Sequence, residues 1–137
     1  MALLSNHIHS MMPYERLTAW SSAHEFAVAV YAATKAFPKS ELYGLTSQIR
    51  RAAFSVPANI AEGASKRGSA EFRRFLDIAL GSFAETSYAL RFARDVGLLA
   101  QNDFERLQKL RIRVGKLTWG LYSAIANNAR SAVSKSK

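Results

Sequence analysis

Apolar residues recur at steps of three and four positions in four segments of the chain, which is the spacing of one face of an α-helix. The pattern predicts helices over residues 18–36, 44–64, 69–97 and 102–129, and no segment favours a strand. Connections of only a few residues place consecutive helices antiparallel. We therefore predict an all-α fold, an antiparallel up-and-down four-helix bundle.

The first two predicted helices each have an apolar face that we expect to line the core. His24 lies on the core face of the first helix, where a partly buried imidazole is the common outcome. Pro57 falls inside the second helix and, because proline lacks a backbone N–H, we expect it to kink the helix or to split it in two. The positions expected to be buried are Trp20, Ala23, Ala27, Val30 and Tyr31 in the first helix, and Leu45, Ile49, Ala52, Ala53, Val56 and Ile60 in the second.

The third and fourth helices carry residues typical of helix ends. We predict Ser69 as the N-cap of the third helix and Gly97 as its stop. The spacing of Asn102 and Glu105 resembles a capping box at the start of the fourth helix. The expected core positions are Phe72, Phe75, Ala79, Phe83, Thr86, Leu90 and Ala93 in the third helix, and Leu107, Leu110, Val114, Leu117 and Leu121 in the fourth.

The two ends of the chain differ in composition from the segments between them. We predict a flexible N-terminal extension over residues 1–13, a bundle domain over 14–130, and a frayed basic tail over 131–137. The N-terminus lacks the basic region and apolar run of a secretory signal, and no window reaches the roughly 20 apolar residues of a membrane helix. The chain has no cysteine, which fits a reducing compartment. We expect a cytoplasmic protein that does not enter a membrane.

Positive charge is concentrated near the end of the chain. Of the 137 residues, 19 are Lys or Arg and 10 are Asp or Glu, so the formal net charge is +9. Residues 100–137 hold eight of the basic and two of the acidic side chains, a local net charge of +6. Four basic side chains of the fourth helix recur at steps of 3-4-3 and form what we call the basic stripe: Arg106, Lys109, Arg113 and Lys116.

The basic stripe has two interpretations. Lys and Arg on a helix usually form only a solvated face. Here, however, almost no acidic residue lies within the run to neutralise it. We predict that the stripe binds the phosphates of a nucleic acid, with RNA favoured over DNA. Such binding depends strongly on salt and carries little sequence specificity.

A second apolar stripe on the fourth helix lies roughly 140° around the helix from the core stripe. It consists of Ile112, Gly115, Trp119, Tyr122 and Ala126. A helix in a small monomeric bundle needs only one buried face, so we predict that Ile112, Trp119 and Tyr122 form a contact between copies of the chain. The alternative is a scatter of exposed aromatic side chains, which is common on protein surfaces.

A polar stripe on the second helix carries Gln48, Arg51, Ser55, Asn59 and Glu62 at steps of 3-4-4-3. One hypothesis is a polar site completed by Glu85 from the third helix. The other, which we favour, is a hydrogen-bonding network at a boundary between helices or subunits. In that network Ser55 and Asn59 would satisfy carbonyls that Pro57 leaves free.

The motifs of catalysis are missing from the sequence. A di-metal carboxylate bundle needs Glu-x-x-His pairs, and none occurs in the chain. There is also no phosphate-binding glycine-rich loop, no G-x-S-x-G elbow and no H-E-x-x-H pair. We therefore expect no catalytic residue, no metal site and no cofactor, and we predict that the protein is not an enzyme.

Residues 45–63, LTSQIRRAAFSVPANIAEG, resemble the signature of the bacterial four-helix bundle protein family, first noticed as products of intervening sequences in 23S ribosomal RNA genes. Further matches flank this stretch, including Trp20, Phe37-Pro38 and residues 79–85, so the resemblance covers roughly residues 14–128. The resemblance implies a small antiparallel bundle that assembles into a ring-like homopentamer. It carries no known catalytic residue over to this chain.

The family is also similar in shape to the pentameric accessory protein of diversity-generating retroelements, which engages a reverse transcriptase and nucleic acid. Two hypotheses follow for this chain. In the first, a basic homo-oligomer binds RNA or DNA through the basic stripe. In the second, the bundle is a protein-interaction scaffold that docks a partner enzyme such as a reverse transcriptase, and its charge is incidental.

Overall fold

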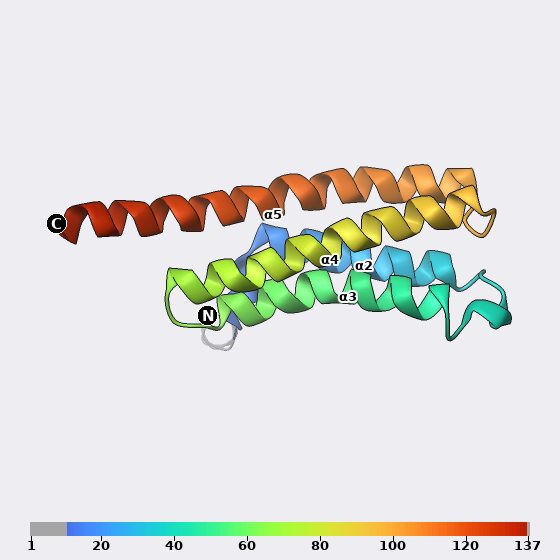
Figure 1. The fold of residues 1–137 in the computed structure, drawn as a ribbon, viewed down its shortest axis with the longest axis horizontal. Helices are drawn as coiled ribbons and strands as arrows, with labels where there is room; N and C mark the ends of the chain where they lie inside the picture. Colours follow the sequence, from blue (N-terminus) through green and yellow to red (C-terminus); the bar gives the residue numbers. More distant parts are fainter. Residues whose placement is uncertain (1–10, 137) are drawn as a thin grey trace, which may run out of the picture.

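The computed structural model describes residues 11–136, and Figure 1 shows them as a bundle of long helices. The α-helices follow in the order α2 (Thr18–Thr34), α3 (Leu45–Ala64), α4 (Ser69–Asp95) and α5 (Gln101–Ser136). Two short 3-10 helices, η1 (Pro13–Arg16) and η2 (Lys39–Glu41), precede α2 and α3. Residues 11–136 contain no strand. The predicted all-α four-helix bundle is confirmed.

The helices pack in a closed order. α2 contacts α3, α3 contacts α4, α4 contacts α5, and α5 returns to contact α2. Consecutive helices run antiparallel, since each short turn sends the chain back along the helix before it (Figure 1). The α2/α3 side of the bundle and the α4/α5 side therefore face in opposite directions.

The core is formed by one face of every helix. Burial of each large apolar side chain contributes about 1.5–3 kcal/mol relative to leaving it exposed. The predicted core face of α3 is correct, because its expected positions from Ile49 to Ile60 are buried and Leu45 is half-buried. The largest fully buried apolar side chains are Phe26, Val30, Ile49, Val56, Ile60, Leu76, Leu90, Leu107 and Val114.

The predicted core face of α2 is wrong in part. Ala23 and Val30 are fully buried as expected, but Tyr31 is 52% exposed. Phe26, which is not on the predicted face, has no exposed surface at all. Apolar residues surround most of α2, so their spacing alone does not decide which face turns inward. The observed buried positions of α2 are Ala19, Ser22, Ala23, Phe26, Val30 and Thr34.

α3 passes through Pro57 as one continuous helix. Proline removes the N–H that would bond to the carbonyl of Ala53, a loss that often breaks a helix. Here Pro57 is buried, and Val56 and Ile60 on either side of it are fully buried in the core, so packing holds this part of the helix in place. The predicted split of the helix is wrong, and the predicted kink is not confirmed.

The end of α4 agrees with the sequence. Gly97 adopts a φ of 84°, a left-handed conformation that glycine reaches without strain. The N–H of Leu98 donates to the carbonyl of Ala93 at 2.8 Å, and the N–H of Gly97 donates to the carbonyl of Arg94 at 3.0 Å. These two bonds form a Schellman motif. The predicted stop at Gly97 is therefore confirmed.

The starts of α4 and α5 differ from the prediction. The N-cap of α4 is Gly68, with a φ of 88°, and Ser69 is already the first helical residue. α5 begins at Gln101, and its side-chain amide donates to the carboxylate of Glu105 at 3.2 Å. Glu105 is thus paired with Gln101 rather than in a box with Asn102.

α5 is longer than its neighbours. It has 36 residues against 27 in α4, which at 1.5 Å per residue corresponds to about 54 Å and about 40 Å. Its C-terminal end projects past the other helices (Figure 1). The helix continues to Ser136, beyond the predicted end near residue 129, because no glycine or proline follows Gly120. Most of the predicted N-terminal extension, residues 1–13, lies outside the described residues.

Candidate functional site

The basic stripe lies on one exposed face of α5. Leu107 and Val114, on the core face about 100° around the helix, are fully buried, so the core orients α5 and leaves the stripe exposed to solvent. Ten residues separate its two ends, which corresponds to about 15 Å along the helix axis. The structure thus brings together, on the surface, the four side chains singled out in the sequence: Arg106, Lys109, Arg113 and Lys116.

The four cations differ in their electrostatic environment. The guanidinium of Arg106 forms an ion pair with Asp103, one turn earlier in α5. Across residues 11–136, no ion pair involves Lys109, Arg113 or Lys116. An exposed pair contributes only about 0–1 kcal/mol to stability, but it neutralises the positive charge locally. The unneutralised charge of the stripe is therefore carried by its three later members.

The second apolar stripe of α5 is exposed beside α4. Ile112 is 49% exposed and Trp119 is 55% exposed. Tyr122 is half-buried against the core, and its ring meets that of Trp119 edge-on with 5.9 Å between centroids. The three residues predicted for a subunit contact thus lie together, with Tyr122 the most enclosed of them.

The exposed stripe continues onto α4. A Cβ atom added to Gly115 would lie 3.3 Å from the ring of Phe83, so this glycine lets α4 and α5 approach closely. Beside this contact lies a shallow depression of about 430 Å³ that includes Ala84, Tyr88 and Trp119. Tyr88 is 67% exposed. We call Phe83, Ala84, Tyr88, Ile112 and Trp119 the α4/α5 apolar surface.

The polar stripe of α3 faces α4. The hydroxyl of Ser82 donates to the hydroxyl oxygen of Ser55 at 2.8 Å, a contact between the two helices. Asn59 donates from its amide to both the hydroxyl and the carbonyl oxygen of Ser55, each at 2.8 Å. Gln48 donates to the carboxylate of Glu85 at 3.5 Å. Ser82 was not predicted to belong to this network, because the sequence does not indicate which residue a serine inside a helix will contact.

These bonds favour the network interpretation of the polar stripe over that of an active site. The bond from Ser82 to Ser55 joins α3 to α4, as the network interpretation expects, whereas the contact of Glu85 with Gln48 is the one that the polar-site hypothesis expects. The expectation that Asn59 satisfies the carbonyl left free by Pro57 is not met, because Asn59 donates to the carbonyl of Ser55 and not to that of Ala53. Arg51 and Glu62, the other two members of the polar stripe, are exposed.

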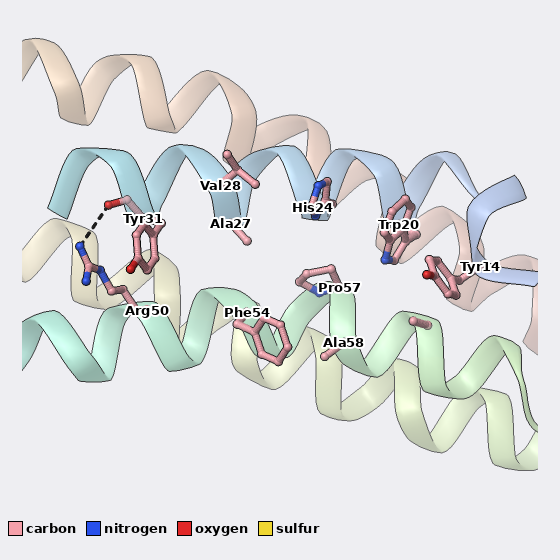
Figure 2. A pocket seen from close by; sticks show the side chains of 11 residues that line it. Tyr14, Trp20, His24, Ala27, Val28, Tyr31, Arg50, Phe54, Pro57 and Ala58 are labelled. Atoms are coloured by element: carbon pink, nitrogen blue, oxygen red, sulfur yellow. Dashed lines mark hydrogen bonds between the residues drawn. The ribbon is translucent and has the colours of Figure 1, made fainter. Parts of the chain in front are cut away.

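A groove between α2 and α3 was not predicted from the sequence. Figure 2 shows aromatic side chains from α2 facing Phe54 and Pro57 of α3 across it. Its volume is about 440 Å³, and Phe54 is 69% exposed. We call it the α2/α3 groove and define it by Trp20, His24 and Tyr31 on α2, and Phe54, Pro57 and Ala61 on α3.

Stacking and hydrogen bonds fix the walls of the α2/α3 groove. The rings of Trp20 and His24 stack with 5.1 Å between centroids and 9° between planes, and His24 is exposed rather than partly buried as predicted. The guanidinium of Arg50 lies 3.8 Å from the ring centroid of Tyr31. The Nε of the same guanidinium donates to the hydroxyl of the buried Thr34 at 2.8 Å. Its Nη2 donates to the carbonyl of Tyr31 at 3.3 Å, a bond shown in Figure 2.

In the part of the chain that the structure describes, no group of three or more His, Asp or Glu side chains is placed to hold a metal ion. Over the same residues, no helix combines the length and the apolar character that spanning a bilayer would require.

Comparisons with known proteins agree with the fold. Residues 15–120 match the family described as 23S rRNA-intervening sequence protein. The structure is similar to the crystal structure of a protein with unknown function from the S23 ribosomal protein family of Bacteroides thetaiotaomicron, with a TM-score of 0.69. The two chains are 26% identical, and the match covers 77% of this chain and 98% of the other. No curated protein matches the sequence.

Proposed function

Because this chain belongs to the 23S rRNA-intervening sequence protein family, we propose that it is a binding protein rather than an enzyme, and that it binds RNA through the basic stripe of α5. The observation that carries the proposal is the free charge of that stripe. Lys109, Arg113 and Lys116 share one exposed face, and no acidic side chain pairs with them in residues 11–136.

The chemistry of the stripe fits phosphate rather than base recognition. Phosphate groups attract exposed cations and release condensed counterions when they are neutralised, which gives affinity with strong salt dependence. Contacts of this kind carry no direct sequence information. This chemistry fits a nucleic acid recognised mainly through its phosphate backbone, and RNA is the ligand that we propose.

Fluorescence anisotropy with a labelled RNA hairpin tests this proposal. The variant Lys109→Gln/Arg113→Gln/Lys116→Gln should bind about 100-fold more weakly near 0.1 M salt, since each lost phosphate contact removes a factor of about five. A duplex DNA of equal length is the second ligand and should bind more weakly than the RNA.

A matched control removes three charges elsewhere. Lys39, Lys66 and Arg67 are exposed and lie outside α5. Their replacement by glutamine lowers the net charge equally and should change the affinity by no more than about threefold, as expected for a distant, screened charge. Equal losses in the two triple variants, or no RNA binding by the wild type, would contradict the proposal.

We also propose that copies of the chain associate through Ile112, Trp119 and Tyr122, into the homopentamer that the family resemblance implies. The support is the exposure of Ile112 and Trp119 on a face that the bundle itself does not cover. Light scattering on the wild type should give a mass well above the 15.2 kDa of one chain. Trp119→Glu should give a monomer, because it places an unpaired charge in an apolar contact.

A further inference from the structure

The bundle exposes apolar side chains on two opposite sides. The α2/α3 groove and the α4/α5 apolar surface lie across the bundle from each other, since the helices pack in the closed order α2, α3, α4, α5. Phe54 on the first side is 69% exposed, and Trp119 on the second is 55% exposed. A single contact that buried only one of these sides would leave the other in water.

The two surfaces match in length. The groove follows residues 20–31 of α2 and residues 50–61 of α3, and the depression on the other side follows residues 80–91 of α4. Each of these segments corresponds to about 16 Å of helix. A helix face from one side can therefore lie along the whole length of the other.

Charge disfavours pairing of the α4/α5 side with itself. α5 carries seven Lys or Arg residues and two acidic ones, whereas α2 and α3 together carry two of each. A two-fold contact between α4/α5 sides would bring two strongly basic helices together. A contact between the α4/α5 side and the neutral α2/α3 side avoids this repulsion and covers both apolar surfaces.

We propose that the α4/α5 apolar surface of one copy of the chain docks into the α2/α3 groove of the next copy. This inference rests on the self-association proposed above and names the surface that receives Trp119. The contact is heterologous, because it joins two different surfaces: the first copy keeps a free acceptor side and the second a free donor side, so further copies can add. Trp119 enters the groove between the aromatic wall of α2 and Phe54.

A heterologous contact can be tested by complementation. Trp119→Glu removes the donor surface and leaves the groove intact, whereas Phe54→Glu removes the acceptor and leaves the donor intact. Each variant alone should be a monomer of 15.2 kDa. An equimolar mixture should form a 1:1 heterodimer of twice that mass. The intact α4/α5 apolar surface of the Phe54→Glu chain can dock into the intact groove of the Trp119→Glu chain, and the two altered surfaces form no further contact.

The controls separate docking from folding and from RNA binding. Both positions are more than half exposed, so each variant should keep the far-ultraviolet circular dichroism of the wild type. Ile78→Glu places the same charge at a 41% exposed position that lines neither surface, and it should assemble as the wild type does. Masses are measured by light scattering without nucleic acid, so they do not depend on RNA binding.

Each remaining outcome would overturn the inference. If Phe54→Glu assembles like the wild type while Trp119→Glu is a monomer, the groove is not the acceptor, although self-association through Trp119 stands. If both variants are monomers and their mixture forms no heterodimer, the contact is not heterologous. A monomeric wild type would overturn this inference and the proposed self-association together.

Discussion

Replacing Gly63 by alanine probes the close approach of α3 and α4, which positions the polar stripe and the turn that follows it. An added Cβ would lie 2.9 Å from the Cβ of Phe75 and 3.1 Å from the ring of Phe72. The first of these atoms is attached directly to the backbone of α4, so it cannot move away without shifting the helix. Gly63 is buried, and it is the last residue of the stretch that resembles the family signature.

The expected change in the free energy of unfolding follows from two opposing effects. Alanine is favoured over glycine inside a helix by about 1 kcal/mol. Overpacking a tight site costs about 1–3 kcal/mol, and the short distance to Phe75 places Gly63 toward the upper end of that range. We therefore expect Gly63→Ala to lower the free energy of unfolding by roughly 1–2 kcal/mol.

Gly81 provides the matched control. It lies inside α4, and an added Cβ there would meet nothing within 4 Å. Gly81→Ala should therefore raise the free energy of unfolding by about 1 kcal/mol. The two variants should differ in melting temperature by roughly 10 °C, measured by circular dichroism at one protein concentration. If Gly63→Ala melted at or above the temperature of the wild type, the close approach of the two helices would be refuted.

Two further substitutions test the packing of α3. Pro57→Ala restores an N–H opposite the carbonyl of Ala53 and should raise the free energy of unfolding by about 1–2 kcal/mol in urea titrations, whereas a loss of stability would show that the proline ring is required. Ser55→Ala and Ser82→Ala should each cost about 1 kcal/mol, and the double variant should cost less than the sum, because the two hydroxyls share one hydrogen bond. The control is Ser65→Ala, at an exposed serine that bonds only within its own turn, and it should change the free energy of unfolding by less than about 0.5 kcal/mol. If the effects of Ser55→Ala and Ser82→Ala were fully additive in the double variant, the bond between the helices would be refuted.

Part of the fold could be predicted from the sequence, because the apolar spacing of α3 indicates which face of that helix is buried. Ile49, Val56 and Ile60 form one stripe of bulky apolar side chains, and only the orientation that buries them leaves Arg51 and Glu62 of the same helix exposed. Gly97 likewise ends α4 through a backbone conformation that favours glycine. The buried face of α3 and the end of α4 are thus both determined by residues close together in the sequence.

α2 shows where this reasoning fails. Trp20 and Tyr31 are large and apolar, yet they line the α2/α3 groove while Phe26 fills the core. The choice between faces depends on what α3 and α5 present to α2, and this is a tertiary property that periodicity does not contain. The groove itself could not be predicted, because it arises from two helices that lie side by side only in the folded chain.

The basic stripe was predictable, but its electrostatics were not. Exposure of Lys109, Arg113 and Lys116 follows from the burial of the core face of α5, which lies about 100° around the helix from them. The ion pair of Arg106 with Asp103 depends on side-chain conformation and involves a residue that precedes the stripe. The structure therefore reduces the set of unneutralised cations from four to three.

The salt dependence of RNA affinity tests the central claim most directly. For the wild type, a plot of log K against log salt concentration should have a steep negative slope. The slope should become shallower by about 2–3 when Lys109, Arg113 and Lys116 are replaced by glutamine, because each phosphate contact contributes about 0.7 in a single strand and about 0.9 in a duplex. The triple variant of Lys39, Lys66 and Arg67 should keep the wild-type slope. Equal slopes in the wild type and in the variant lacking the three α5 cations would contradict RNA binding through the basic stripe.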